Sequence, residues 1–253
     1  MMPCQIVAGF GYIIPPIMIS IIIAAYNEEQ RIIPSLLTIR DYCVTNNLRN
    51  EIIVVDDGST DNTRFVAKDI VSRIPQLKVI GYDTNMGKGY ALRTGVLAAT
   101  GDYVLVTDAD LSTPIDELSK LLHLVHNKHC EIAIGSRALA LSVILEKQPR
   151  WRQSMGKLFN KMVKFLIMDD FNDTQCGFKL FRGDCARTLF KEAQVNRFAY
   201  DVEILVLAKR YGYRICEVPI RWINSLPSKV NPLTDSANML FDLLKIRARF
   251  GKI

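Results

Sequence analysis

The sequence predicts a single α/β domain built on a mostly parallel central sheet. Short apolar, β-branched runs alternate with helical stretches over the first 137 residues, a pattern typical of strand–helix–strand units with parallel pairing. The 253 residues are 49% hydrophobic and 23% charged, which is enough for one large buried core. Acidic residues directly follow two of the apolar runs, and open α/β sheets bind ligands at the carboxyl ends of their strands.

The amino-terminal stretch has no charged side chain from Met2 to Asn27. Its β-branched part, residues 18–25, reads as the first buried strand. The part before that strand is too short to span a bilayer and is interrupted by Pro15 and Pro16. We therefore expect residues 1–17 to be an N-terminal extension, poorly ordered or lying against lipid, and residues 18–253 to form the domain.

The remaining elements follow in order. A helix is expected after the first loop, to about Tyr42, and another between the second and third strands. Further strands are expected at 51–55, 77–81, 103–107 and 131–134, and further helices at 87–99 and 115–127. After Arg137 the alternation breaks down into mixed helix and short strand. We interpret 18–137 as a nucleotide-sugar half and 138–253 as an acceptor half facing the membrane.

Charge and cysteine content narrow the class of protein. The net charge of +6 favours an anionic partner, which could be a nucleotide, a nucleic acid or an acidic membrane surface. The six cysteines are scattered without a Cys-x-x-Cys pair, so neither a zinc site nor a disulfide framework is indicated. A reducing, cytosolic setting fits this pattern.

Two carboxylates, Asp108 and Asp110, follow the apolar run 103–107 with one residue between them. Hard oxygen ligands at this spacing suit Mg²⁺ or Mn²⁺ carrying a diphosphate. The simpler alternative is that they cap the next helix. A second acidic strand end, Asp56 and Asp57, favours the metal, because two carboxylate clusters at one sheet edge exceed the needs of capping.

Three further stretches carry weaker signals. Residues 85–89, with Lys88 between glycines, resemble a phosphate-cradling turn before a helix, although not a Walker A sequence. Residues 154–168 and 235–250 combine apolar residues with lysine and arginine at helical spacing. Both stretches fit helices at a membrane interface, and both also fit surface helices packed on the core.

The motifs occur in the order seen in one known family. They are residues 26–29, 55–61, 87–89, 108–110, 135–137, 173–181, 200–203 and 228–229. Over about residues 18–250 the chain resembles the family 2 glycosyltransferases that act on polyprenyl phosphates. Within that family it looks most like the dolichyl-phosphate β-glucosyltransferases, chiefly through Asp-Thr-Gln-Cys-Gly-Phe-Lys-Leu-Phe at 173–181. It departs from the family at Ala24, where proline is usual, and in lacking the carboxy-terminal transmembrane segments of some relatives.

The resemblance implies a GT-A fold and inverting transfer of a hexose to a polyprenyl monophosphate, and it favours glucose from UDP-glucose as the hexose. It implies a peripheral protein on the cytoplasmic face of a membrane, Mg²⁺ or Mn²⁺ as cofactor, and no nucleic-acid partner. The donor-binding residues are expected to be Tyr26, Glu28, Asp56, Asp57, Lys88, Asp108 and Gln175, and the metal ligands Asp108 and Asp110. The expected acceptor-phosphate ligands are Arg137, Arg152 and Lys229, and the expected catalytic residues Asp110, Arg137 and Asp201.

Other functions fit parts of the pattern. A mannosyltransferase using GDP-mannose would share the fold and the metal pair. A sugar-nucleotide nucleotidyltransferase would want a glycine-rich, basic loop after the first strand, where this chain has Ala-Tyr-Asn-Glu at 25–28. A non-catalytic, membrane-attached nucleotide-binding protein would keep Asp57 without needing both Asp108 and Asp110.

Overall fold

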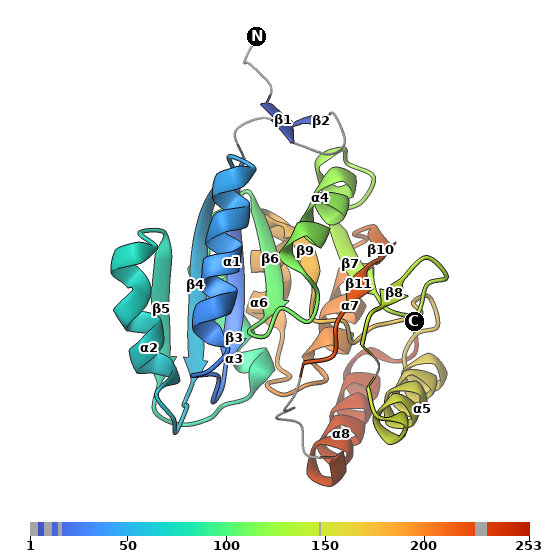
Figure 1. Cartoon of the computed structure of the whole chain (residues 1–253). Helices are drawn as coiled ribbons and strands as arrows, with labels where there is room; N and C mark the ends of the chain where they lie inside the picture. Colours follow the sequence, from blue (N-terminus) through green and yellow to red (C-terminus); the bar gives the residue numbers. More distant parts are fainter. Residues whose placement is uncertain (1–4, 8–11, 15–16, 147, 226–231) are drawn as a thin grey trace.

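A seven-stranded sheet forms the centre of the molecule (Figure 1), in the order β10-β7-β9-β6-β3-β4-β5. The computed structural model describes residues 5–7, 12–14, 17–146, 148–225 and 232–253. The strands are β3 (Met18–Ala25), β4 (Arg49–Asp57), β5 (Leu77–Tyr82), β6 (Tyr103–Asp108), β7 (Ile132–Ser136), β9 (Lys179–Arg182) and β10 (Ile215–Pro219). All neighbours are parallel except β9, which is antiparallel to both β6 and β7. The predicted α/β fold with a mostly parallel sheet is confirmed.

Helices cover both faces of this sheet. One face carries α1 (Ile32–Thr45), α2 (Thr63–Asp69), the 3-10 helices η1 (Ile70–Arg73) and η2 (Ile115–Glu117), and α4 (Leu118–His126). The other carries α3 (Lys88–Ala98), α5 (Arg150–Leu166), α6 (Gly183–Glu192), α7 (Tyr200–Arg210) and α8 (Pro232–Phe250). The result is a helix–sheet–helix sandwich with a core on each side of the sheet.

Strand β3 shows why the first prediction was successful. Ile19, Ile21 and Ile23 point to the face of α1 while Ile22 points to the face of α3, and each is at most 1% exposed. Both faces are therefore buried, which is what a continuous apolar run requires. Helix α3 approaches closely, because a Cβ on Gly95 would lie 2.5 Å from Ile22 Cγ2.

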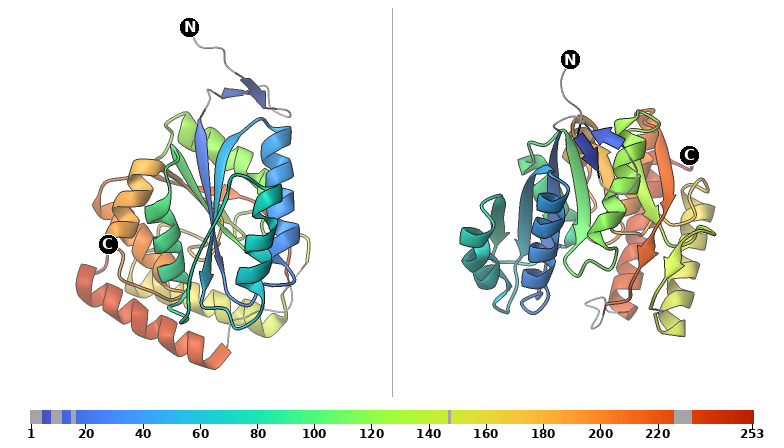
Figure 2. Two further views of the ribbon diagram at one scale, coloured as in Figure 1. Left: turned by 90° about the vertical axis from the view of Figure 1, so that its left-hand side faces the viewer. Right: turned by 45° about the horizontal axis from the view of Figure 1, so that its top comes forward.

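The second half of the chain does not form a separate layer. Its strand β9 inserts between β6 and β7, and β10 extends the sheet at one edge. A small parallel pair, β8 (Val143–Ile144) with β11 (Arg221–Trp222), lies beyond that edge. Helices α5 and α8 pack against each other along the lower border of the molecule (Figure 2), below the carboxyl ends of the parallel strands.

The amino-terminal extension contains two short antiparallel strands, β1 (Gln5–Val7) and β2 (Tyr12–Ile14), which the sequence did not predict. They stand off the domain at the amino-terminal end of β3 (Figure 1). The expectation of poor order in residues 1–17 stays a prediction. No helix of the described residues has the length and apolar character needed to cross a bilayer.

Candidate functional site

A cleft of about 470 Å³ lies at the carboxyl ends of the central strands. Most of the residues predicted from sequence line it. They are Tyr26, Glu28, Asp57, Lys88, Asp108, Asp110, Arg137, Arg152 and Gln175. The two acidic strand ends meet there because β3 pairs with both β4 and β6, so their carboxyl ends share one edge of the sheet.

The loop after β6 presents its carboxylates to the cleft. Lys88 Nζ, at the start of α3, lies 2.5 Å from Asp108 Oδ1. Asp110 Oδ1 accepts a hydrogen bond from the backbone N–H of Ser112 at 3.0 Å, and a positive φ of 47° at Leu111 bends the chain between them. No side chain caps η2 at Pro114, so the capping alternative does not describe these aspartates.

The Lys88–Asp108 pair is charged at neutral pH. Burial opposes both charges, but Asp108 and Asp201 hold the pKa of Lys88 above its usual value. The pKa of Asp108 is likewise lowered, against the effect of burial, by Lys88, Lys179 and Arg137. Asp108 is therefore ionised at neutral pH, and its carboxylate can pair with Lys88 or bind a metal ion.

Gly177 packs directly on this carboxylate. A Cβ at Gly177 would lie 2.3 Å from Asp108 Oδ2, far inside van der Waals contact. The backbone at this point thus packs against Asp108, and any larger residue would displace the carboxylate. This is the reason for glycine in the 173–181 motif.

The chemistry of Asp108 and Asp110 fits the predicted Mg²⁺ or Mn²⁺. In the part of the chain that is described, no three or more His, Cys, Asp or Glu side chains are grouped to hold a metal by themselves. One or two carboxylates completed by substrate phosphates is, however, the usual way of holding Mg²⁺. Both carboxylates line the cleft, so a metal arriving with a diphosphate suits them better than a permanently bound ion.

The loop after β4 is organised differently. The carboxylate of Asp57 accepts hydrogen bonds from Tyr82 Oη at 2.8 Å, Met86 N at 2.8 Å, Gly87 N at 3.0 Å and Asn85 Nδ2 at 3.0 Å. The pKa of Asp57 is raised above its usual value, because burial outweighs the hydrogen bonds from Met86, Tyr82 and Gly87, which act in the opposite direction. Gly87 has φ of 98°, which favours glycine. Asp57 therefore fixes the turn that opens α3 and positions Lys88.

The prediction that Asp56 contacts the donor is not supported. Its side chain is completely buried and pairs with Arg64, whose Nε lies 2.8 Å from Asp56 Oδ2. Asp56 does not line the cleft. Successive strand residues point to opposite faces, so Asp56 and Asp57 cannot both face the ligand.

Arg31 is a site residue that sequence reasoning missed. Its Nε lies 2.6 Å from Glu28 Oε2, and its Nη2 lies 2.6 Å from Glu28 Oε1. Its Nη1 donates to Ser225 Oγ at 3.1 Å and lies 3.6 Å from Asp110 Oδ2. The only sign of this pair in the sequence is an acidic and a basic residue three positions apart just before a helix. Such pairs are common on helix surfaces, so the spacing did not point to a functional site.

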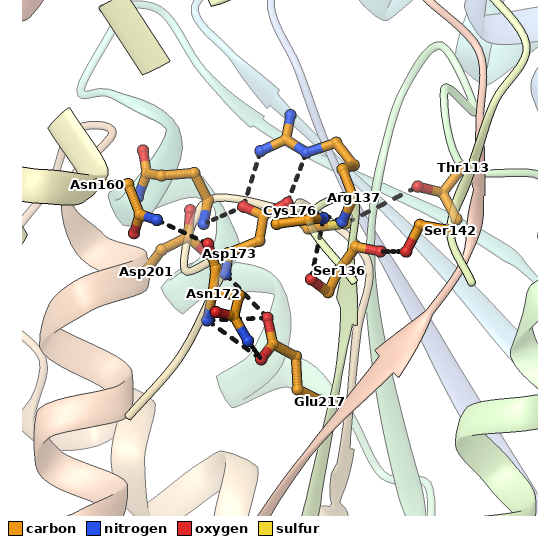
Figure 3. A network of polar contacts seen from close by, with 12 residues as sticks. Thr113, Ser136, Arg137, Ser142, Asn160, Asn172, Asp173, Cys176, Asp201 and Glu217 are labelled. Atoms are coloured by element: carbon orange, nitrogen blue, oxygen red, sulfur yellow. Dashed lines mark hydrogen bonds and ion pairs between the residues drawn. The ribbon is translucent and has the colours of Figure 1, made fainter. Parts of the chain in front are cut away.

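Arg137 is held as a fixed cation at the end of β7 (Figure 3). Its Nε, Nη2 and backbone N–H donate to the Asp173 carboxylate at 2.7, 2.9 and 3.0 Å. Asp173 is anchored in turn, because its N–H donates to Glu217 Oε1 at 2.8 Å. Against the effect of burial, Arg137 lowers the pKa of Asp173 to about 2. The guanidinium also lies 5.7 Å from the ring centre of Trp222.

Asp201, predicted as catalytic, lies beneath the cleft and does not line it. Asp201 is 4% exposed and forms an ion pair with Lys179 Nζ, which also donates to Cys176 O at 2.7 Å. The structure therefore gives Asp201 a position from which it orients the 176–179 segment. Lys229, predicted to bind the acceptor phosphate, lies outside the described residues.

Gln175 has the features of a ligand-reading side chain. It lines the cleft, and its Nε2 is buried without a hydrogen-bond partner. Buried polar groups are normally satisfied, so this nitrogen suits a ligand oxygen. The other residues that line the cleft are Ala24, Ala25, Asn85, Met86, Gly87, Ala109, Ser112, Gln148, Gly177, Arg197, Phe198, Trp222, Asn224, Ser225 and Asp235.

Sheet, cleft and paired carboxylates together define a glycosyltransferase of the GT-A fold. The fold agrees with that of glucosyl-3-phosphoglycerate synthase from Mycobacterium tuberculosis in complex with Mn²⁺ and UDP-glucose. The TM-score is 0.69 at 18% identity, over 94% of this chain and 80% of that chain. Mannosyl-3-phosphoglycerate synthase from Rubrobacter xylanophilus gives a TM-score of 0.67 at 18% identity, over 92% and 73% of the two chains.

The family model of glycosyl transferase family 2 matches residues 20–190, and the chain belongs to that family. The chain is 36% identical over 252 residues to the dolichyl-phosphate beta-glucosyltransferase of Drosophila melanogaster, covering 93% of this chain and 76% of the relative. The enzyme of the same name from Homo sapiens is 33% identical over 248 residues, with the same coverage of 93% and 76%. The predicted family and enzyme class are confirmed.

Proposed function

We propose that this enzyme transfers glucose from UDP-glucose to a dolichyl-type polyprenyl monophosphate, with inversion, at the cytoplasmic face of a membrane. The observation that carries the proposal is the single cleft in which Asp108 and Asp110 lie together with Arg137 and Arg152. Such a cleft joins a site for a metal–diphosphate to a site for a second phosphate. The names of the relatives, dolichyl-phosphate beta-glucosyltransferases, support the choice of sugar and acceptor.

On the donor side, Asp57, Glu28 and Tyr26 bind the nucleoside. Lys88, positioned by the Asp57 turn, lies beside the diphosphate. Asp108 and Asp110 would hold Mg²⁺ or Mn²⁺, which would supply positive charge to offset that of the departing UDP. Gln175 donates from its unpartnered Nε2 to a sugar hydroxyl.

On the acceptor side, Arg137 presents a guanidinium whose position is fixed by Asp173. Guanidinium groups bind phosphate oxygens in pairs, and Arg152 and Lys229 add further positive charge. A lipid phosphate is largely ionised near pH 7, so its oxygen attacks the anomeric carbon without a general base. This agrees with a buried Asp201 that is paired to Lys179.

Because the proposed acceptor is a lipid, the cleft must lie close to a membrane surface. Helix α5 exposes Leu158 and Phe165, 59% and 77% accessible, beside Lys157 and Lys161. Helix α8 packs beside it and exposes Leu240, Phe241 and Leu244. Arg152 on α5 and Asp235 on α8 both line the cleft, so each of these helices also contributes to the cleft. An apolar and basic surface of this kind suits the interface of an anionic bilayer.

A donor comparison tests the proposal. The full chain is assayed in detergent with a polyprenyl phosphate, Mn²⁺ and either UDP-glucose, GDP-mannose or UDP-N-acetylglucosamine. We expect UDP-glucose to be used at least about tenfold faster than GDP-mannose. A preference for GDP-mannose would refute the glucosyl assignment and leave the fold, the metal pair and the phosphate acceptor in place.

Two variants separate the donor and acceptor sides. Arg137→Ala should raise the KM for the prenyl phosphate far more than it weakens UDP binding. Arg40→Ala, at a half-buried arginine of α1 that does not line the cleft, should change neither. Gln175→Ala should narrow the preference for UDP-glucose over GDP-mannose while sparing UDP affinity. Equal losses of acceptor and UDP binding in Arg137→Ala would contradict this division.

A further inference from the structure

The charged residues lining the described part of the cleft balance one another. The five acidic residues are Glu28, Asp57, Asp108, Asp110 and Asp235, and the five basic ones are Arg31, Lys88, Arg137, Arg152 and Arg197. A divalent cation alone would add two positive charges, and the diphosphate of a nucleotide sugar alone would add two negative ones. Only their joint entry leaves the balance unchanged.

Each predicted metal ligand already has a cation beside it. Lys88 Nζ lies 2.5 Å from Asp108 Oδ1, and Arg31 Nη1 lies 3.6 Å from Asp110 Oδ2. A positive charge this close to a carboxylate opposes the arrival of a second cation, and in a half-buried cleft the repulsion is only partly screened by water.

Arg31 is held in place and is not a mobile surface charge. Its side chain is 20% exposed, and Glu28 accepts from Nε and Nη2 in a two-point fork. This fork directs the remaining nitrogen, Nη1, toward Ser225 and Asp110. A forked arginine loses little entropy on holding such a position, so its charge stays beside Asp110.

We propose that Arg31 is the resident counter-ion of Asp110 and makes metal binding in this loop depend on the diphosphate of the donor. Without diphosphate, Arg31 neutralises Asp110 and weakens its attraction for a divalent ion. With diphosphate, the added negative charge offsets Arg31 and the ion binds. The inference rests on the proposed metal pair, and it makes Arg31 a positioning residue of the donor site.

The test measures Mn²⁺ binding by calorimetry on the full chain, first alone and then with saturating UDP. Arg31→Gln should bind Mn²⁺ alone about tenfold more tightly than the unsubstituted chain, and UDP should enhance its binding correspondingly less. Arg31→Lys keeps the charge and should retain the weak binding of Mn²⁺ alone. Arg197→Gln removes a cleft cation that has no ion pair to Asp110, and it should change the affinity for Mn²⁺ alone by less than about twofold.

Arg31→Met provides a second variant with the same sign. It removes the charge beside Asp110 and keeps an unbranched aliphatic side chain, so Mn²⁺ alone should bind more tightly than in the unsubstituted chain. This variant carries the test if circular dichroism shows that Arg31→Gln is unfolded.

Several results would overturn the inference. Unchanged or weaker binding of Mn²⁺ by folded Arg31→Gln or Arg31→Met, or an equal gain in Arg197→Gln, would each refute it. Failure of the proposed function is distinguishable, because it would show as Mn²⁺ and UDP binding without transfer of glucose to a prenyl phosphate.

Discussion

The two acidic strand ends use their aspartates in different ways. After β4, Asp57 accepts hydrogen bonds from four neutral groups, and its neighbour Asp56 is buried against Arg64. After β6, Asp108 and Asp110 line the cleft, each beside a single cation. Similar acidic motifs therefore give two different arrangements. Asp57 is fixed by hydrogen bonds from its own loop, whereas Asp108 and Asp110 each pair with a cation that a metal ion could replace.

The difference follows from what each carboxylate must do. Hydrogen bonds from a turn hold a carboxylate in one orientation, which suits recognition of a ligand and support of the loop itself. A lone cation at one oxygen leaves other lone pairs for a metal ion, and it can be exchanged for that ion. The β4 end thus supports the turn before α3, and the β6 end presents the carboxylates that we propose as metal ligands.

The largest expected effect is at the β6 end. Asp110→Asn should abolish transfer, a loss on the order of a hundredfold or more, because a hard anionic ligand is removed from the loop that lines the cleft. The fold should remain, as judged by circular dichroism and thermal unfolding. Asp41→Asn, which breaks an exposed ion pair with Arg40, is the matched control and should retain turnover. Full Mn²⁺-dependent turnover in Asp110→Asn would refute the metal assignment.

Gly177→Ala tests the backbone that holds Asp108. The added methyl would lie 2.3 Å from Asp108 Oδ2, so the carboxylate must move. We expect about tenfold weaker Mn²⁺ binding in the presence of UDP, measured by calorimetry. Gly156→Ala on α5 has open space at its Cβ and should leave Mn²⁺ binding unchanged while stabilising the helix by up to about 1 kcal/mol. Equal behaviour of the two variants would contradict the role of Gly177.

At the β4 end, neighbouring aspartates should give opposite phenotypes. Asp57→Asn disturbs the turn before α3 and should raise the KM for UDP-glucose about fivefold. Asp56→Asn should leave that KM unchanged and lower the free energy of unfolding by about 1–3 kcal/mol, because it weakens the buried pair with Arg64. Steady-state kinetics and urea unfolding distinguish them. An increased KM for UDP-glucose in Asp56→Asn would show that Asp56 contributes to donor binding after all.

The smallest expected effect is at Asp173, whose carboxylate is held by Arg137 through three hydrogen bonds. The pKa of Asp173 is about 2 in the folded state, below its unfolded value, so its contribution to stability is complete above about pH 5 and is lost as the pH falls toward 2. Asp173→Asn should therefore remove about 1 kcal/mol of the stability lost between pH 6 and pH 3, measured by urea unfolding at both values. An unaltered pH dependence would show that Arg137 does not hold this carboxylate ionised.

Much of the fold was predictable because parallel strands buried on both faces leave a strong trace in sequence. The strand expected at 18–25 is β3 with the same bounds, and that expected at 103–107 is one residue shorter than β6. The helices expected at 87–99 and 115–127 also match α3 and the η2–α4 pair closely. Strand β9 was not placed, because an antiparallel insertion between β6 and β7 depends on long-range pairing that local patterns do not encode.

The sequence by itself determined the parallel strands β3 to β7, because each is a short apolar run, and it determined the family from the order of the motifs. It also identified Asp57, Asp108 and Asp110, because each ends or closely follows an apolar run. Only the tertiary structure decided which charges meet. It turned Asp56 toward Arg64, placed Arg31 between Glu28 and Asp110, and buried Asp201 against Lys179. An ion pair depends on a few ångströms between groups far apart in the chain, whereas burial of a strand depends on the composition of one short segment.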